Sequence, residues 1–115
     1  MIKLKRIYES PDEADGLRLL VERLWPRGVS KEKAAVDLWL KDIAPSAELR
    51  QWFAHDSEKW QEFRRRYREE VRASPALEML RELILQHPVI TFVYAASNEQ
   101  NSATVLKAFI EKAKT

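Results

Sequence analysis

The stretch VITFVY, from Val89 to Tyr94, decides the fold class of this chain. Every residue in it is β-branched or aromatic, which is typical of a central strand buried on both faces of its sheet. A sheet that is covered on both faces needs helices on both sides. The sequence therefore predicts an α/β fold with this segment inside the sheet.

Three further segments have the composition of strands, near 2–8, 18–24 and 36–40. The first alternates with period two, the second is more apolar, and the third is also compatible with a helix. The polar segment SPDEADG connects the first two and is too short to carry a crossover helix. These two strands are therefore either an antiparallel pair or not neighbours in the sheet.

Helices are expected between and after these strands, because capping residues precede amphipathic runs. Ser97 and Gln100 form a capping-box pattern at the start of the last one. The sequence thus predicts a single domain over 1–115, a small Rossmann-like α/β sandwich with a four-stranded, mostly parallel or mixed sheet flanked by helices. The expected helical segments are 30–35, 46–54, 56–72, 74–86 and 97–112.

Composition excludes several classes of function. The 115 residues include 20 Lys and Arg, 18 Asp and Glu, and no Cys, which excludes disulfides and thiolate chemistry and favours a cytoplasmic location. With 2 Gly, the chain has no glycine-rich phosphate loop, and no apolar run is long enough for a membrane span. Its 2 His are isolated from each other, so neither a metal nor another cofactor is expected.

The loop RLWPRGVSK, residues 23–31, is the first candidate binding site. Pro26 and Gly28 turn the chain here, but a plain turn has no need of two guanidinium groups, an indole and an ammonium group. A guanidinium group offers a fork of donors that matches phosphate or carboxylate oxygens. The residues expected to contact an anionic ligand are Arg23, Trp25, Arg27 and Lys31.

A structural explanation of the same loop stays open. Arg23 would then pair with Asp37 or Asp42 on a neighbouring element and brace the turn. Trp25 and Trp39 would be half-buried core residues instead of stacking on a base or a sugar.

The segment YAASNEQN, residues 94–101, follows the central strand and supplies the second half of the expected site. Ligands of open α/β sheets bind beyond the carboxyl ends of the strands, and parallel strands would bring this segment and the 23–31 loop to one edge. We expect Tyr94, Asn98 and Asn101 to line a shared, positively biased cleft. Its ligand would be small and anionic, a nucleotide or a phosphorylated metabolite.

An enzyme of unknown reaction in the same cleft is an alternative function. Its candidate groups are Arg23, Arg27, and either Asp37 or His55. His55 stands beside Asp56, and such a pair suits acid–base chemistry. The same position, between two predicted helices, also suits ordinary helix capping.

The run RRRYR at 64–68 suggests another alternative, contact with nucleic acid. Helical spacing favours local ion pairs instead, because Glu62 lies four residues before Arg66. Glu69 and Glu70 lie four residues after the second and third arginines of the run. The residues that would reach phosphates are Arg64, Arg65 and Arg68.

Three blocks of the sequence are specific enough to indicate a family. They are VERLWPRG at 21–28, LWLKDIAPS at 38–46 and WFAHD at 52–56. With them, nearly the whole chain resembles the YeaO-like proteins of domain-of-unknown-function family 488. The resemblance implies a small bacterial or archaeal cytoplasmic protein with a Rossmann-like α/β fold, varied residues on its strand-end loops, and no established reaction.

One segment departs from the family pattern. Where close YeaO-like sequences read roughly YAAKDEEHNxA, this chain has YAASNEQNSA at 94–103, which is shorter and lacks the Lys, the Asp and the His. More distant members carry Cys and His-Arg in this region, and this chain has neither there. The resemblance therefore supports the predicted fold and weakens the enzyme alternative.

The apolar face of the longest predicted helix allows a first stability test. Trp60, Phe63 and Tyr67 recur on one face and are expected to be buried, while Arg65 and Arg66 stay exposed. Truncating a buried aromatic side chain costs about 3–5 kcal/mol, whereas an exposed substitution changes the free energy of unfolding by about 0.5 kcal/mol or less. Chemical denaturation of Phe63→Ala and Arg65→Ala should show this difference, and equal, small losses would mean that the face is assigned wrongly.

Overall fold

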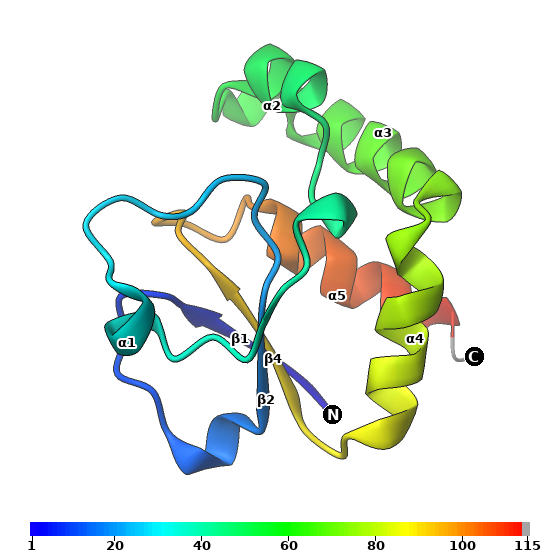
Figure 1. Cartoon of the computed structure of the whole chain (residues 1–115). Helices are drawn as coiled ribbons and strands as arrows, with labels where there is room; N and C mark the ends of the chain where they lie inside the picture. Colours follow the sequence, from blue (N-terminus) through cyan, green and yellow to red (C-terminus); the bar gives the residue numbers. More distant parts are fainter. Residues whose placement is uncertain (114–115) are drawn as a thin grey trace.

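The computed structural model describes residues 1–113 and shows strands and helices in the predicted alternation (Figure 1). Within this described part, no helix combines the length and the apolar character needed to cross a membrane. The strands are β1 (Ile2–Arg6), β2 (Leu17–Leu20), β3 (Leu38–Trp39) and β4 (Ile90–Tyr94). The α-helices are α1 (Lys31–Ala34), α2 (Ala47–Phe53), α3 (Trp60–Ala73), α4 (Ala76–Gln86) and α5 (Ser102–Ala113), and short 3-10 turns lie at Glu13–Asp15, Lys41–Ile43 and Ser57–Lys59.

The four strands form one parallel sheet in the order β1-β4-β2-β3. Both β1 and β2 pair with β4, in registers that align Leu4 and Leu19 with Phe92. The prediction of a central strand at 89–94 is confirmed. The sequence left a mostly parallel and a mixed sheet open, and the sheet is parallel. The first two strands are not neighbours, because β4 lies between them.

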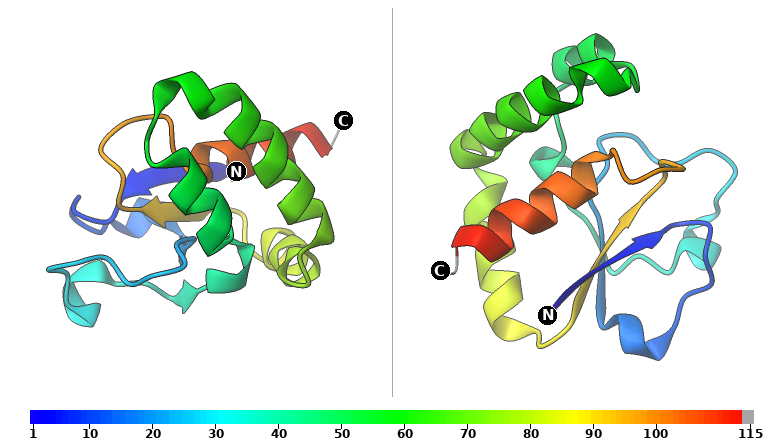
Figure 2. Two further views of the ribbon diagram at one scale, coloured as in Figure 1. Left: turned by 90° about the horizontal axis from the view of Figure 1, so that it is seen from above. Right: turned by 180° about the vertical axis from the view of Figure 1, so that it is seen from behind.

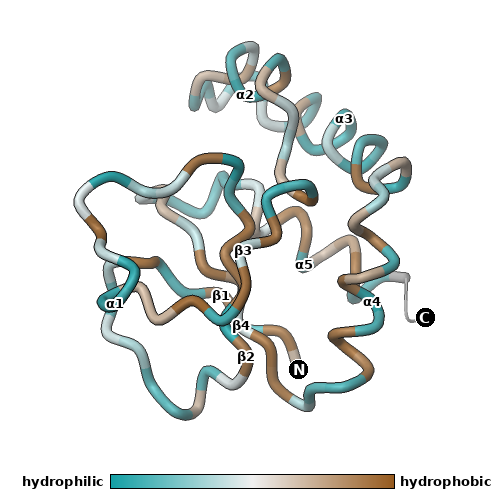
Figure 3. Tube along the Cα trace, viewed as in Figure 1, coloured by the Kyte–Doolittle hydropathy of each residue, from teal (hydrophilic) through white to brown (hydrophobic). Residues whose placement is uncertain are grey.

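Helices lie on both sides of this sheet (Figure 2), and a hydrophobic cluster covers each of its faces. On β4, Ile90 and Phe92 belong to the larger cluster, which contains apolar residues of α2, α3, α4 and α5. Val93 belongs to the smaller cluster on the other face, with Leu20 of β2 and Ala34 of α1. The strands that cross at the centre of Figure 3 are accordingly mostly hydrophobic. Burial on both faces explains why β4 carries no charged residue.

Helix α3 presents an aromatic face to the core, as its sequence predicts. Phe63 and Tyr67 are buried, Trp60 is half-buried, and Arg65 and Arg66 are exposed. The Tyr67 hydroxyl donates at 2.6 Å to a backbone carbonyl of the 3-10 turn before α2. Burial raises the pKa of Tyr67 well above its usual range.

One ion pair lies inside the fold and joins the start of β2 to the turn before it. Arg18 and Asp15 are both buried, and their Nη1 and Oδ2 atoms are 2.7 Å apart. Lys5 Nζ lies 3.2 Å from the same carboxylate, and the Asp12 backbone N–H donates to it. Burial raises the pKa of Asp15, but the hydrogen bonds from Asp12, Lys5 and Arg18 outweigh that effect and hold the pKa below its usual range.

The expected strands are longer than the observed ones. The predicted strand at 18–24 ends at Leu20, because the Glu22 carboxylate accepts the Ala95 N–H at 2.9 Å where a longer β2 would continue the backbone ladder. The predicted strand at 36–40 comprises two residues, since the chain enters a 3-10 turn directly afterwards. The predicted strand at 2–8 ends two residues early.

The start of α5 also differs from the prediction. The capping box of Ser97 and Gln100 does not form, and the helix begins at Ser102. Asn101 caps it, because its Oδ1 atom accepts the Thr104 backbone N–H at 3.0 Å. Asparagine caps helices as well as serine does, so the local pattern leaves the choice between the two open. Ser30 and Ser46 cap α1 and α2. Asp56 caps the 3-10 turn before α3, and the Ser74 hydroxyl accepts the Ala76 N–H at the start of α4.

Loss of the Asp15 charge should destabilise the fold. Asp15→Asn leaves the buried Arg18 guanidinium without its counter-ion, and breaking such a pair costs about 3–5 kcal/mol. Glu13→Gln, which alters an exposed acid of the same turn, should change the free energy of unfolding by about 0.5 kcal/mol or less. Urea denaturation at neutral pH measures both variants.

The stability of the wild type and that of Asp15→Asn should depend differently on pH. The folded-state pKa of Asp15 lies below its unfolded value, so the stability from its charge is present at neutral pH and is lost as the pH falls through the folded pKa. The gap between wild type and Asp15→Asn should therefore shrink in acid. A gap that stays constant with pH would contradict this assignment.

Candidate functional site

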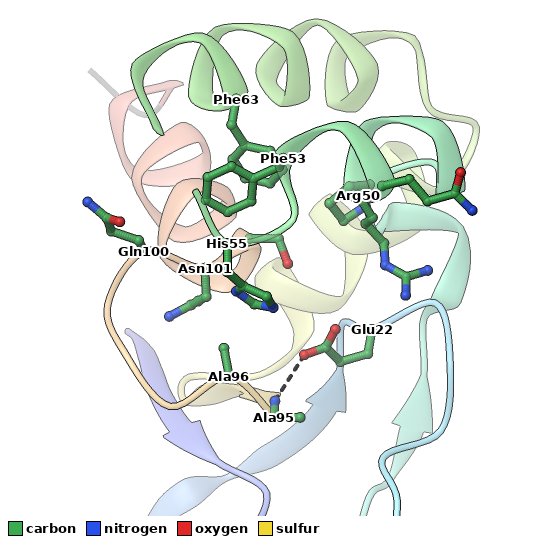
Figure 4. Close-up of a pocket in the computed structure, with 12 residues that line it drawn as sticks. Glu22, Arg50, Phe53, His55, Phe63, Ala95, Ala96, Gln100 and Asn101 are labelled. Atoms are coloured by element: carbon green, nitrogen blue, oxygen red, sulfur yellow. Dashed lines mark hydrogen bonds between the residues drawn. The ribbon is translucent and has the colours of Figure 1, made fainter. Parts of the chain in front are cut away.

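A cleft of about 420 Å3 opens beyond the carboxyl ends of β2 and β4 (Figure 4). Ligands of parallel α/β sheets bind at such an edge. The parallel pairing of β2 with β4 confirms that the two strand-end loops share this edge. The lining residues are Glu22, Pro45, Arg50, Gln51, Phe53, His55, Phe63, Ala95, Ala96, Gln100, Asn101 and Ser102.

Glu22 holds a carboxyl group at the strand-end side of the cleft. Its Oε1 atom accepts the Ala95 N–H at 2.9 Å, which ties the end of β2 to the end of β4. Burial raises the pKa of Glu22, although the Ala95 hydrogen bond and the charges of Arg50 and His55 oppose the shift. A carboxyl group with a raised pKa in a cleft is a feature of functional sites.

Arg50 and His55 reach the same space from α2 and the turn after it (Figure 4). Ala54 and His55 have φ angles of 45° and 57°, and this left-handed conformation is uncommon for residues other than glycine. The turn that they form directs the imidazole between Glu22 and Asn101. The side chains of Arg50 and His55 make no hydrogen bond or salt bridge with any residue that the structure describes, so their donors are open to a ligand.

The rest of the lining includes two stacked phenylalanine rings and the Asn101 amide, whose hydrogen bonds are made within the protein. Phe53 and Phe63 stack with ring centroids 4.3 Å apart. Asn101 is engaged, because its Oδ1 caps α5 and its Nδ2 donates to the Asn98 carbonyl at 2.7 Å. The charged and imidazole side chains among the described lining residues are therefore those of Glu22, Arg50 and His55, next to the buried rings of Phe53 and Phe63.

The RLWPRG loop is braced against the protein itself. Arg23 donates through Nε and Nη2 to the carbonyl oxygens of Pro45 and Ala44, at 3.0 and 2.9 Å. The Trp25 indole donates to the Val29 carbonyl at 2.7 Å. The Arg23 bonds tie the loop to the segment before α2, and the Trp25 bond closes the loop on itself.

The structural alternative for this loop was right about the tryptophans and wrong about the acids. Trp25 and Trp39 are half-buried with their rings edge to face, 5.5 Å between centroids. Arg23 bonds to backbone carbonyls, and neither Asp37 nor Asp42 forms an ion pair with it within the described chain. Backbone carbonyls thus do the bracing that was expected of aspartates.

The remaining predicted ligand contacts are spread around the molecule. Arg27 and Lys31 are exposed on the far part of the loop, and Tyr94 is half-buried against the core. The Asn98 Oδ1 atom accepts a backbone N–H of its own loop at 2.9 Å. Among the described residues that line the cleft, Asn101 is the one predicted as a ligand contact.

The exposed arginines of α3 partly follow the expected pattern of ion pairs. Glu62 accepts from Arg65 at 2.6 Å and from Arg66 at 2.7 Å, which confirms the predicted Glu62–Arg66 pair. The hydrogen bonds from Arg65 and Arg66 lower the pKa of Glu62 to about 2. The pairs expected of Glu69 and Glu70 with the same arginines do not form in the described structure.

His55 and Asp56 are adjacent in sequence but have different roles, one in the cleft and the other in capping a turn. Asp56 caps the following turn, because its Oδ1 accepts the Glu58 N–H at 3.0 Å. His55 lines the cleft and makes no hydrogen bond with Asp56. Over residues 1–113, no three His, Cys, Asp or Glu side chains are grouped to hold a metal ion.

Comparison with known proteins identifies the family of this chain. A family model described as "Inactive DUF488-N3 subclade" matches residues 1–115. The chain belongs to this family. It is 39% identical to the uncharacterized protein YeaO of Escherichia coli over 107 residues, 91% of this chain and 92% of YeaO. It is 48% identical to the uncharacterized protein Rv3073c of Mycobacterium tuberculosis over 82 residues, 71% of this chain and 70% of the relative. No solved structure matches.

Two cleft residues of this DUF488 protein escaped prediction from the sequence, Glu22 and Arg50. Glu22 had a usable signal, because it is an acid at the end of the apolar run LRLLV, where strand-end ligand sites form. No sequence signal marked Arg50, since it is one of many charged residues on a predicted amphipathic helix. The YeaO-like resemblance itself is confirmed by the match to the family and to YeaO.

Replacing Glu22 by the isosteric glutamine should raise the free energy of unfolding at neutral pH. The amide oxygen keeps the Ala95 hydrogen bond, while the partly desolvated charge is removed. The folded-state pKa of Glu22 lies above its unfolded value, so the wild type gains stability as the pH falls through that folded pKa. The advantage of Glu22→Gln should therefore shrink toward acid pH in thermal or urea unfolding.

An exposed glutamate of α2 is the control for this test. Glu48→Gln removes the same charge outside the cleft lining and should leave stability nearly unchanged. A Glu22→Gln protein that is less stable than wild type at every pH would refute the argument.

Proposed function

We propose that the cleft binds a small phosphorylated ligand that also carries hydroxyl groups, such as a sugar phosphate or a nucleotide. The observation that carries the proposal is the open space between Glu22 on one side and Arg50 and His55 on the other. A ligand with an anionic group and a hydroxyl donor satisfies both sides at once. A simple anion would satisfy only the cations and would be repelled by the carboxylate.

The chemistry of each group supports this ligand class. The Arg50 guanidinium matches phosphate oxygens with paired donors, and the imidazole of His55 can add a further donor. The free oxygen of Glu22 can accept a hydrogen bond from a sugar hydroxyl, since the other oxygen is held by Ala95. The volume of about 420 Å3 is within the range of small-molecule sites.

Binding without catalysis is favoured over an enzyme in this cleft. The matching family is described as an inactive subclade. The 94–103 segment, which borders the cleft, has none of the Lys, Asp and His residues that close YeaO-like sequences carry there. A cytoplasmic location, consistent with a metabolite ligand, stays a prediction.

The ligand class can be tested by titrating ribose 5-phosphate and inorganic phosphate in separate calorimetric experiments. Arg50→Gln should weaken ribose 5-phosphate binding about tenfold or more, because a hydrogen bond to a charged group contributes about 1.5–3 kcal/mol. Glu22→Gln should change the affinities for the two probes in opposite directions. It should weaken ribose 5-phosphate, which loses its hydroxyl acceptor, and strengthen inorganic phosphate, which loses a like charge.

Arg27→Gln is the matched control, since it removes one exposed guanidinium from the loop without touching the cleft lining. It should leave both affinities unchanged. Equal effects of Arg50→Gln and Arg27→Gln, or no saturable binding of either probe, would reject the proposal. An effect of Arg27→Gln alone would instead assign the ligand to the RLWPRG loop.

A further inference from the structure

A second hollow, of about 1100 Å3, lies between α3, α4 and α5. These three helices lie together on the side of the molecule away from α1 (Figure 2). The hollow shares Gln100 with the cleft and is otherwise lined by different residues. We call it the arginine groove, because its lining includes Arg64, Arg68, Arg72 and Arg81.

The cations of the arginine groove have a regular spacing. Arg64, Arg68 and Arg72 recur every four residues along α3, so they form a row with steps of about 6 Å. Arg81 adds a cation from α4. Glu99 is the one acidic side chain among the described lining residues. Arg72 is paired with Glu69 at 3.0 Å, so the excess of positive charge in the groove comes from Arg64, Arg68 and Arg81.

Two of these arginines are not used by the fold. The side chains of Arg68 and Arg81 make no hydrogen bond, ion pair or ring contact with any described residue. This contrasts with Arg65 and Arg66, which lie outside the groove on the side of α3 next to α2 and both bind Glu62. Neighbouring cations without a counter-ion repel one another, and an anionic partner would remove that repulsion.

The groove combines this charge with an apolar floor. Leu77 and Val105 form its base but are buried in the core, so the apolar surface open to a partner comes from the exposed Ala108 and the half-buried Phe109. Cations already lie over its aromatic rings. The Arg64 guanidinium lies over Trp60, 6.0 Å from the ring centroid, and the Arg72 guanidinium lies over Phe109 at 5.7 Å; Trp60 also stacks on Phe63.

We propose that the arginine groove docks an acidic amphipathic helix of a partner protein. A helix with Glu or Asp at every fourth position places carboxylates at the same rise as the arginine row. Leucine-like residues beside those acids would pack on the exposed Ala108 and the half-buried Phe109. Charge complementarity with apolar burial thus selects a helix that is acidic on one side and aliphatic beside it.

Single-stranded nucleic acid fits the groove less well. Its phosphates would match the cations, but its affinity depends on bases that stack on open aromatic faces. The faces of Trp60 and Phe109 that meet the groove cations are covered. A phosphate backbone also gains nothing from this apolar surface, whereas a leucine-bearing helix does.

The test uses a fluorescein-labelled, stapled peptide of about four helical turns, with Glu at every fourth position and Leu beside it. A matched peptide carries Gln in place of Glu. Fluorescence anisotropy should show saturable binding of the Glu peptide to wild type and much weaker binding of the Gln peptide. Arg68→Gln combined with Arg81→Gln should weaken the Glu peptide about tenfold, since each exposed ion pair contributes up to about 1 kcal/mol.

Arg65→Gln combined with Arg66→Gln is the control, because it removes the same charge from residues of α3 that do not line the groove, and it should leave binding unchanged. Ala108→Glu provides a second test in the floor, as an exposed helical site that tolerates glutamate and should block the peptide. Equal weakening by the two double variants, or no saturable binding by wild type, would overturn the proposal. Tighter binding of a labelled oligodeoxythymidine at the same site would assign the groove to nucleic acid and also overturn it.

Discussion

Strand β4 is hydrogen-bonded along both edges and covered on both faces, and the remaining elements are arranged around this double burial. Its neighbours β1 and β2 run parallel to it, so the chain between them has to return along the outside of the sheet. Apolar residues on each face then require a layer on each side, supplied by α2 to α5 and by α1 with its flanking residues within 25–39. Parallel pairing also brings the ends of β2 and β4 to one edge, where the cleft opens.

At that edge the backbone ladder is replaced by a side chain. Glu22 takes the Ala95 N–H that a longer β2 would have bonded, so one carboxyl group both ends the strand and enters the cleft. The raised pKa of Glu22 and the left-handed turn at Ala54 and His55 are both unfavourable features. Such features persist where surrounding structure holds them, and they gather at ligand sites.

Arginine serves three different purposes in this protein, and the surroundings decide which. Arg18 is buried and completes a charge network with Asp15. Arg65 is exposed and neutralised locally by Glu62. Arg68, one turn along from Arg64, has no partner in the described chain and lines a groove with excess positive charge. Net charge alone would not separate these cases, because the chain carries only +2.

The sequence by itself determined the features that depend on near neighbours. The β-branched run at 89–94 predicted the central strand, the aromatic residues of α3 predicted its buried face, and the starts of α1 and α2 followed from their serine caps. These signals succeed because periodic burial and capping act within a few residues. They also explain the error at α5, where serine and asparagine were equally good local caps.

Tertiary structure alone decided the strand order and the composition of the cleft. Glu22, Arg50 and His55 come from separate elements, and packing of α2 over the sheet edge brings them to one space. The predicted anion contact Arg23 lies nearby in sequence, yet two backbone carbonyls engage it. Which polar group meets a ligand depends on which partners the rest of the fold has already supplied, and local sequence carries no record of partners that lie twenty or more residues away.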